Sequence, residues 1–236
     1  MHAGMLQVAN EESGKNEKMS KSLNNFVLLH EALEQVKPNV LRMLVLQTHY
    51  RSPLVFGEKR LTEAEAALNR IETAINNIDW KIQNTSDDSK VDSEKIDEAC
   101  KVAKENFIEA MDDDFNTSKA LAEIFELVGQ IYTLVGEDAV DAKTANSLSA
   151  ARDLLAELLG VFGIVFSENK EENSEALVEI AKKLDIDPGD DAAQAILDVR
   201  SEARKNKDFE LADKIRDTLQ AEGFTIEDTP SGPRLI

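Results

Sequence analysis

The sequence of 236 residues is poor in several residue types on which whole classes of protein depend. Its single cysteine, Cys100, excludes an intrachain disulfide and a cysteine-based metal site, and it fits a reducing compartment. No apolar run approaches the ~20 residues that a membrane-spanning helix needs. Residues 1–10 lack the basic start and apolar stretch of a signal peptide. These absences together lead us to expect a cytoplasmic protein that makes no contact with membranes.

Aromatic residues are also sparse, at 5%, whereas the apolar fraction of 42% is ordinary. The chain is rich in Ala, Leu, Glu and Lys, which favours helices over a sandwich or a barrel. Charge is unevenly spread: residues 1–60 carry eight Lys/Arg and six Asp/Glu, residues 61–190 carry twelve and thirty, and residues 191–236 carry seven and ten. The acidic middle would repel phosphate, so an anionic ligand is expected at one of the two ends.

Hydrophobic periodicity predicts four amphipathic helices between residues 57 and 166, which together form a four-helix bundle. The apolar positions of the first two helices are Leu61, Leu68, Ile71, Ile75, Ile78 and Ile82, then Ile96, Cys100, Ala103, Phe107 and Met111. Those of the last two are Leu121, Ile124, Phe125, Val128, Ile131 and Val135, then Val140, Leu148, Leu155, Leu158 and Leu159. Cys100 shares an apolar face, so we interpret it as a small core residue and not as a nucleophile. Asn116 or Thr117 is expected to cap the third helix, and Gly136 to end it.

The flanks of the bundle divide into short segments with different patterns. These are a strand and a polar loop (1–25), two short helices separated at Pro38 (27–50), a polar linker (167–191), a helical hairpin (192–222) and a β-hairpin after Gly223. The expected fold is therefore mainly α, with a small α+β domain at residues 192–236.

One short stretch near the N-terminus stands apart, the sequence EKMSKSLNN at residues 17–25, which predicts no helix or strand and is expected to form a flexible loop. Lys18 and Lys21, three positions apart, can place two ammonium groups on one polyphosphate. The hydroxyls of Ser20 and Ser22 add further donors. Where the ligand is a triphosphate, the lysines matter most as charge builds on the departing pyrophosphate. A solvated Lys/Ser loop without a ligand is an equally good interpretation of so short a motif.

The motif KMSKS also matches, letter for letter, the second signature of class I aminoacyl-tRNA synthetases. Four more stretches, HYRSPL, AMDDDFNT, ARKNKDFELADKIRD and EDTPSG, follow it in the order and spacing seen in cysteinyl-tRNA synthetases. The whole chain therefore resembles the C-terminal half of that family, beginning near the end of the catalytic domain. Two parts of the family pattern are missing: the first signature, His-Ile-Gly-His, and the cysteine, histidine and glutamate ligands of a zinc site. The sequence also has LNN where the family typically has Leu-Gly-Asn.

The resemblance implies a division of the chain into five parts. The first part (1–25) is the end of a class I catalytic domain, a remnant of its nucleotide-binding fold that carries the KMSKS loop. The others are a stem-contact segment (26–56), a tRNA-binding helical bundle (57–166), a linker (167–191) and an anticodon-binding domain (192–236). It also implies ATP, with Mg²⁺, as the ligand of the KMSKS loop. Lys21 is then the catalytic residue that contacts ATP, and Lys18 assists it. The hydroxyls of Ser20 and Ser22 support the phosphates.

Several further residues are assigned to tRNA by the resemblance. Arg51 in HYRSPL is expected either to meet a tRNA phosphate or to form a structural ion pair. Arg204, Asp213 and Asp228 match positions that hydrogen-bond anticodon bases. Phe209 fills an aromatic position, where it either stacks on a base or packs in the core of the helical hairpin. The neighbouring phosphates are expected to be neutralised by the basic residues of that hairpin, which are Arg200, Arg204, Lys205 and Lys207.

The adjacent carboxylates of Asp112, Asp113 and Asp114 leave two interpretations open. They form either a metal site or a helix N-terminus complemented by acidic side chains, and the second is favoured. The three histidines of the chain have no partner cysteine, so we interpret them as surface or packing residues.

The function implied by the resemblance is that of the C-terminal part of a monomeric cysteine–tRNA ligase, which forms cysteinyl-adenylate from cysteine and ATP and transfers cysteine to tRNA(Cys). Cysteine would bind through the missing N-terminal half, so the chain alone is expected to be inactive. The alternatives from other classes are a free-standing tRNA-binding module and a helical interaction protein without RNA function. The intact KMSKS argues against the free-standing module. The related ligase that joins cysteine to an amino sugar should lack a tail like residues 192–236.

Overall fold

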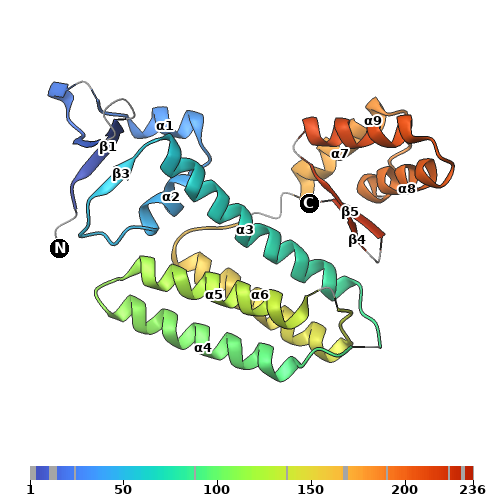
Figure 1. The fold of residues 1–236 in the computed structure, drawn as a ribbon, viewed down its shortest axis with the longest axis horizontal. Helices are drawn as coiled ribbons and strands as arrows, with labels where there is room; N and C mark the ends of the chain where they lie inside the picture. Colours follow the sequence, from blue (N-terminus) through green and yellow to red (C-terminus); the bar gives the residue numbers. More distant parts are fainter. Residues whose placement is uncertain are drawn as a thin grey trace. The chain divides into compact units, whose positions relative to one another are not determined.

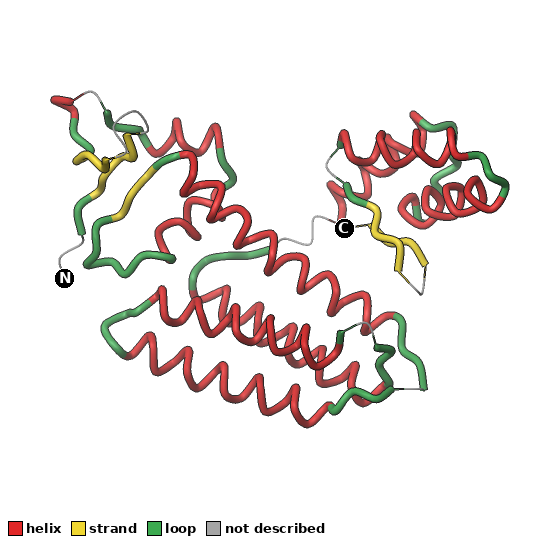
Figure 2. The backbone as a smooth tube through the Cα atoms, viewed as in Figure 1, coloured by secondary structure: helices red, strands yellow, loops and turns green. Residues whose placement is uncertain are grey.

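A computed structural model shows the chain folded into two compact units, Met1–Val165 and Phe166–Ile236 (Figure 1). The structure describes residues 4–10, 15–23, 25–87, 89–136, 138–166, 170–189, 191–222, 224–229 and 232–235. Within these ranges no helix is both long and apolar enough to cross a membrane. Helices predominate in both units, and the strands are few and short (Figure 2). The prediction of a mainly α fold is therefore confirmed.

Four long helices form a bundle in the first unit, as the hydrophobic periodicity predicted. They are α3 (Glu58–Gln83), α4 (Ser93–Asp112), α5 (Thr117–Val135) and α6 (Ala142–Val161). Helix α4 packs against α5 and α6, and α3 packs against α6 (Figure 1). The large side chains that are fully buried here are Ile71, Ile96, Ile124, Leu127, Leu148, Leu155 and Leu159. Because burial of apolar surface is the main stabilising term, these side chains hold the bundle together.

Side-chain caps fix where three of these helices begin. The side chains of Asp92, Asn116 and Asp141 accept hydrogen bonds from backbone N–H groups in the first turns of α4, α5 and α6. Gly136 ends α5 with a φ of +50°, an angle that glycine adopts at little cost. The predicted cap at Asn116 and the predicted stop at Gly136 are both confirmed.

A three-stranded sheet lies at the N-terminal end of the first unit. Strand β1 (Leu6–Asn10) pairs antiparallel with β2 (Lys15–Lys18) and parallel with β3 (Leu54–Phe56), so β1 is the middle strand. The sequence predicted a strand here but not its two partners, because β2 is the polar stretch KNEK and β3 has only three residues. A 3₁₀ turn, η1 (Lys21–Leu23), follows β2. The expectation of a flexible loop throughout KMSKS is therefore wrong, since Lys18 belongs to a strand.

The two short helices predicted on either side of Pro38 are present between the KMSKS turn and β3. They are α1 (Leu29–Gln35) and α2 (Pro38–Leu46). Pro38 is the first residue of α2, a position where its missing N–H costs nothing because first-turn N–H groups have no helical partner. Helix α2 packs against α3 and buries Val40, Met43 and Leu44. Helix α1 buries only Ala32.

The second unit contains three helices and a β-hairpin. They are α7 (Lys170–Lys183), α8 (Ala192–Lys205), α9 (Phe209–Ala221), β4 (Ile226–Thr229) and β5 (Gly232–Leu235). The predicted helical hairpin and β-hairpin are both present. The segment 167–191, expected to be a linker, instead contains α7, whose Leu177, Ile180 and Ala181 lie in the core of this unit. The polar start of that helix, KEENS, obscured a short apolar stripe that follows it.

The bundle core gives a direct stability prediction. Ile124 of α5 is 0% exposed, so Ile124→Ala should leave a cavity and lower the free energy of unfolding of the first unit by about 2–5 kcal/mol. Tyr132 on the same helix is 73% exposed, and Tyr132→Ala should change that free energy by less than about 0.5 kcal/mol. Urea denaturation followed by circular dichroism measures both variants. An equal loss of unfolding free energy in the two variants would contradict the burial of Ile124 in the bundle core.

Candidate functional site

The KMSKS residues begin at the end of β2 and pass into η1. Lys18 is the last residue of β2, and its side chain is exposed. Met19 donates its backbone N–H to the carbonyl of Leu6 in β1 at 3.0 Å, which extends the strand pairing by one residue. The sheet therefore fixes the first half of the motif, and the 3₁₀ turn fixes the backbone of the second half.

The side chain of Asn25 closes this turn. Its amide oxygen accepts the backbone N–H of Ser20 at 2.8 Å, and its amide nitrogen donates to the carbonyl of Lys18 at 3.1 Å. The hydroxyls of Ser20 and Ser22 lie 3.3 Å apart within the same turn. The sequence analysis assigned no such role to Asn25. The available signal was that Asn side chains often hydrogen-bond nearby backbone groups, and Ser20 and Lys18 lie only a few positions before Asn25.

The arrangement can bind a polyphosphate through charge-assisted hydrogen bonds. The structure brings Lys18, Ser20 and Ser22 together in one short segment. The backbone of Lys21 lies in η1, while its side chain lies outside the described residues. The predicted grouping of these residues thus has a defined backbone, and the position of the Lys21 ammonium stays a prediction.

Arg51 lies in a polar cluster that joins the segment before β3 to the turn between α4 and α5. Its Nε is 2.8 Å from Oδ2 of Asp114, and its Nη2 is 3.0 Å from Oδ1. Tyr50 donates its hydroxyl to Asp114 Oδ1 at 2.7 Å, and the Tyr50 oxygen accepts from Arg51 Nε at 2.9 Å. His49 stacks on Tyr50 with 4.8 Å between ring centroids. Arg51 therefore forms a structural ion pair, and a phosphate at this point would have to compete with Asp114.

The same contacts shift the acidity of both charged partners. The hydrogen bond from Tyr50, and then the charge of Arg51, hold the pKa of Asp114 below its ordinary value. The hydrogen bond with Tyr50 and the charge of Asp114 raise the pKa of Arg51. The pair is therefore ionised at any pH near neutrality, and the cluster links residues that are far apart in the sequence.

The three adjacent aspartates lie in the turn between α4 and α5. Asp112 is the last residue of α4, and Asp114 has a φ of +58°, a left-handed angle that Asp tolerates better than most residues. Helix α5 begins after its cap, Asn116, with no acidic residue in its first turn. The interpretation as an acidic helix N-terminus is therefore wrong. Over the part of the chain that the structure describes, no cluster of three or more His, Cys, Asp or Glu side chains is placed to hold a metal ion.

In the second unit, three of the predicted RNA-binding residues lie on α8 and α9, the two helices of the hairpin. The side chains of Arg204, Phe209 and Asp213 are all exposed. Phe209 is 61% exposed, so the interpretation that placed it in the hairpin core is wrong, and Ile215 fills that core instead. The backbone of Asp228 lies in β4, and its side chain is outside the described residues.

The basic residues of this hairpin do not all reach the surface. Arg200 is only 8% exposed, so it cannot serve as a surface phosphate contact, contrary to the prediction. Arg204, Lys205 and Lys207 are exposed, the last with a φ of +61° in the turn. The usable positive charge therefore lies at the end of α8 and in the turn, next to Phe209.

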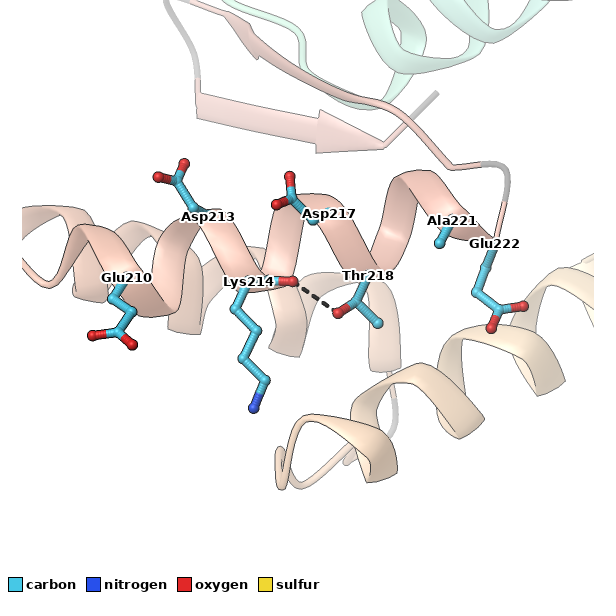
Figure 3. A pocket seen from close by; sticks show the side chains of 7 residues that line it. All are labelled: Glu210, Asp213, Lys214, Asp217, Thr218, Ala221 and Glu222. Carbon is cyan, nitrogen blue, oxygen red and sulfur yellow. Dashed lines mark hydrogen bonds between the residues drawn. The ribbon is translucent and has the colours of Figure 1, made fainter.

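A shallow, open depression of about 690 Å³ runs along α9 (Figure 3). Its lining residues are Glu210, Asp213, Lys214, Asp217, Thr218, Ala221 and Glu222. Asp213 is paired with Nη1 of Arg216 at 3.0 Å, and Glu222 with Lys183 of α7 at 2.6 Å. The lining carries four carboxylates and one ammonium, so the depression disfavours phosphate.

Three matches to known families run along the chain in the order of its structural parts. Residues 1–66 match the family described as the tRNA synthetases class I (C) catalytic domain. Residues 106–167 match the DALR domain, and residues 188–232 match the cysteinyl-tRNA ligase anticodon binding domain. This chain corresponds to the C-terminal portion of a cysteinyl-tRNA synthetase. The resemblance drawn from the five motifs is thereby confirmed.

Whole-sequence relatives agree with these matches. The chain is 37% identical to the cysteine–tRNA ligase of Lactobacillus gasseri, covering 99% of this chain and 44% of that protein. It is 36% identical to the cysteine–tRNA ligase of Thermococcus onnurineus, covering 98% of this chain and 45% of that protein. The chain therefore spans less than half the length of these curated relatives.

A solved structure shares the fold. The ternary complex of an Agrobacterium radiobacter LeuRS with tRNA and LeuAMS matches with a TM-score of 0.51 over 69% of this chain and 22% of that chain, at 21% identity. At this identity the match supports the fold alone.

The Asp114 cluster predicts a pH-dependent stability. Because the pKa of Asp114 is lowered on folding, its stabilising effect is fully present above the ordinary value of 3.8 and is lost as pH falls through the folded-state value. Asp114→Asn keeps an oxygen acceptor for Tyr50 and a residue that tolerates the left-handed backbone, but it removes the charge. Its melting temperature should lie below that of the wild type at pH 7, and the gap should begin to narrow as the pH falls below about 4.

The matched control is Asp113→Asn in the same turn. Asp113 is exposed and follows the end of α4, where negative charge is unfavourable to the helix dipole. Its removal should leave the melting temperature unchanged or slightly higher. A gap for Asp114→Asn that does not vary between pH 7 and pH 3 would contradict the ion-pair account.

Proposed function

We propose that this chain supplies the KMSKS motif and the tRNA-binding parts of a cysteine–tRNA ligase. The single observation that carries the proposal is the order of the three family matches along one chain. In the reaction, the cysteine carboxylate attacks the α-phosphate of ATP and pyrophosphate leaves. A terminal hydroxyl of tRNA(Cys) then takes the cysteinyl group from the adenylate, and AMP leaves. The N-terminal unit would act in the first step, and the C-terminal unit would hold the tRNA for the second.

The KMSKS turn would stabilise the departing pyrophosphate. Lys21 and Lys18 supply positive charge, and the hydroxyls of Ser20 and Ser22 donate hydrogen bonds to phosphate oxygens. Asn25 follows the turn and bonds to the backbone of Lys18 and Ser20, which precede it, and these bonds would hold the turn in one shape before ATP binds. Donors that are already oriented need no reorganisation as charge develops, which is the source of their effect on rate. Mg²⁺ would accompany ATP through the phosphates themselves.

The zinc ion that the resemblance implies does not fit the residues of this chain. Cys100 lies partly buried in α4, and burial, followed by the charge of Asp97, raises the pKa of its thiol to about 11. Metal binding requires a thiolate, so this thiol is a poor ligand. His49 is stacked on Tyr50 and has no cysteine beside it. We therefore assign selection of cysteine to a part of the ligase outside this chain.

The C-terminal unit would bind the anticodon of tRNA(Cys). Exposed Phe209 offers a face for stacking, and Arg204, Lys205 and Lys207 lie close by in sequence to contact phosphates. Asp213, on the acidic side of α9, would accept hydrogen bonds from base amino groups after its ion pair with Arg216 is broken. Asp228 in β4 would add a further acceptor. Because the whole chain carries a net charge of −19, binding depends on these few placed groups and not on general attraction.

The first functional prediction concerns catalysis. The purified chain should show no cysteine-dependent ATP–pyrophosphate exchange above background, because it lacks the groups that orient cysteine and adenine. In a full-length ligase that carries this chain as its C-terminal portion, Lys21→Ala should slow adenylate formation by roughly 10²–10³-fold, the effect of one lost transition-state donor. Cysteine affinity should barely change. Lys37→Ala, an exposed lysine at the cap of α2, is the control and should keep its rate. A normal rate for Lys21→Ala would refute the assignment.

The second functional prediction concerns tRNA recognition. Phe209→Ala should weaken binding of tRNA(Cys) by about 1–3 kcal/mol, the scale of one lost base stack. It should leave the melting temperature of the chain unchanged, because Phe209 is exposed. Binding is measured at one fixed salt concentration, with a tRNA of substituted anticodon as the competitor. Phe115→Ala, which removes an exposed aromatic ring from the first unit, is the matched control. Equal affinity of wild type and Phe209→Ala would remove Phe209 from the interface.

A further inference from the structure

The guanidinium of Arg51 has one edge that its protein partners leave open. A guanidinium presents its N–H groups to oxyanions along two edges, one formed by Nε and Nη2 and the other by Nη1 and Nη2. Asp114 occupies the first edge, with its Oδ2 2.8 Å from Nε and its Oδ1 3.0 Å from Nη2. Within the described parts of the chain no acceptor bonds Nη1, and the Arg51 side chain is 63% exposed. The second edge is therefore available to a ligand.

Three further contacts hold this guanidinium in place. The Tyr50 hydroxyl accepts from Nε at 2.9 Å and donates to Asp114 Oδ1 at 2.7 Å, and Cζ of Arg51 lies 5.5 Å from the centroid of the Tyr50 ring. The backbone N–H of Arg51 donates to Nδ1 of His49 at 3.3 Å. A surface arginine usually loses much rotamer freedom when it binds a ligand. Because Arg51 is already held, binding through its open edge costs less entropy.

The charges around Arg51 decide which kind of anion suits this edge. Residues 37–60 carry five Lys/Arg and one Asp/Glu, in a chain whose net charge is −19. The exposed side chains of Asp112 and Asp113 lie beside Asp114 in the turn and disfavour capture of a small free anion. A phosphate that belongs to a larger polyanion, held by other contacts as well, is presented at a high effective concentration. The edge therefore suits a backbone phosphate of a bound RNA.

We propose that Asp114 and Tyr50 are positioning residues that hold Arg51 so that its Nη1–Nη2 edge binds one backbone phosphate of the tRNA. This inference rests on the proposed function. The two interpretations left open for Arg51 are then compatible, because a phosphate competes with Asp114 only for the first edge. Bidentate contacts between arginine and phosphate depend on such a planar, fixed geometry. Since a phosphate carries no sequence information, the contact adds affinity and not anticodon specificity.

The test measures the Kd of the whole chain for a tRNA(Cys) transcript at several salt concentrations. Arg51→Gln should weaken binding roughly tenfold or more, the scale of a lost hydrogen bond to a charged group. It should also reduce the slope of log Kd against log salt concentration by about 1. The same loss of affinity is expected for a tRNA(Cys) with a substituted anticodon, because the phosphate is common to both RNAs.

Asp114→Asn separates positioning from charge. If the carboxylate only repels RNA, its removal should strengthen binding, whereas loss of positioning should weaken binding by about 2–10-fold, the scale of ordering one long side chain. Asp113→Asn, the matched control, removes the same charge from the same turn and should bind tRNA as the wild type does or slightly better. Tyr50→Phe changes no charge, and it should weaken binding in the wild-type chain but not in the Arg51→Gln background.

Two results would overturn the proposal. One is an Arg51→Gln chain with unchanged affinity and salt dependence, and the other is an Asp114→Asn chain that binds as tightly as Asp113→Asn. Circular dichroism fixes a temperature at which every variant is folded, so unfolding does not enter the comparison. If the wild-type chain binds tRNA(Cys) and these variants bind it equally well, this inference fails and the proposed function stands. If the wild-type chain does not bind tRNA(Cys), both fail.

Discussion

Strand β1 is hydrogen-bonded on both sides, and the first unit depends on that pairing. Its antiparallel partner β2 carries Lys18 to the KMSKS turn, and its parallel partner β3 leads into α3 of the bundle. Just before β1, Gly4 donates its N–H to the carbonyl of Tyr50 at 2.6 Å. A Cβ at Gly4 would lie 1.9 Å from the carbonyl oxygen of Ser52, so only glycine permits this approach. Tyr50 also donates a hydrogen bond to Asp114 in the turn between α4 and α5. A series of direct contacts therefore connects the KMSKS turn, β1 and the bundle.

The distribution of charge fits a division of roles between the ends of the chain. In the acidic bundle, lysines pair with neighbouring helices, as Lys104 does with Glu157 and Lys119 with Glu109. Such exposed pairs contribute little stability, but they leave little positive charge for RNA. The groups suited to anions lie instead in the KMSKS turn and at the turn between α8 and α9. On the proposed function, the KMSKS turn would act near the reactive end of the tRNA and the turn between α8 and α9 at its anticodon.

The helices could be predicted from the sequence because their signals are local. Apolar residues recur every three or four positions, and Asn116 and Gly136 are residues that cap and end helices for known physical reasons. The missed features are those that depend on distant partners. Strand β2 is polar and exists because β1 lies beside it, and the contact of Arg51 with Asp114 spans sixty-three positions. Burial of Arg200 and exposure of Phe209 likewise depend on tertiary packing, which local periodicity does not report. Helix α7, whose apolar residues lie in the core of the second unit, begins with a polar stretch that is typical of a linker.

We propose that this chain is the tRNA-binding portion of a cysteine–tRNA ligase, with its anticodon contact in the second unit. Hydroxyl-radical footprinting of tRNA(Cys) with the purified chain tests this most directly, because it locates the contact on the RNA without any need for catalysis. We expect protection of the anticodon loop at saturating protein, and no such protection when the chain ends before residue 166. Protection of other regions with an unprotected anticodon loop would contradict it.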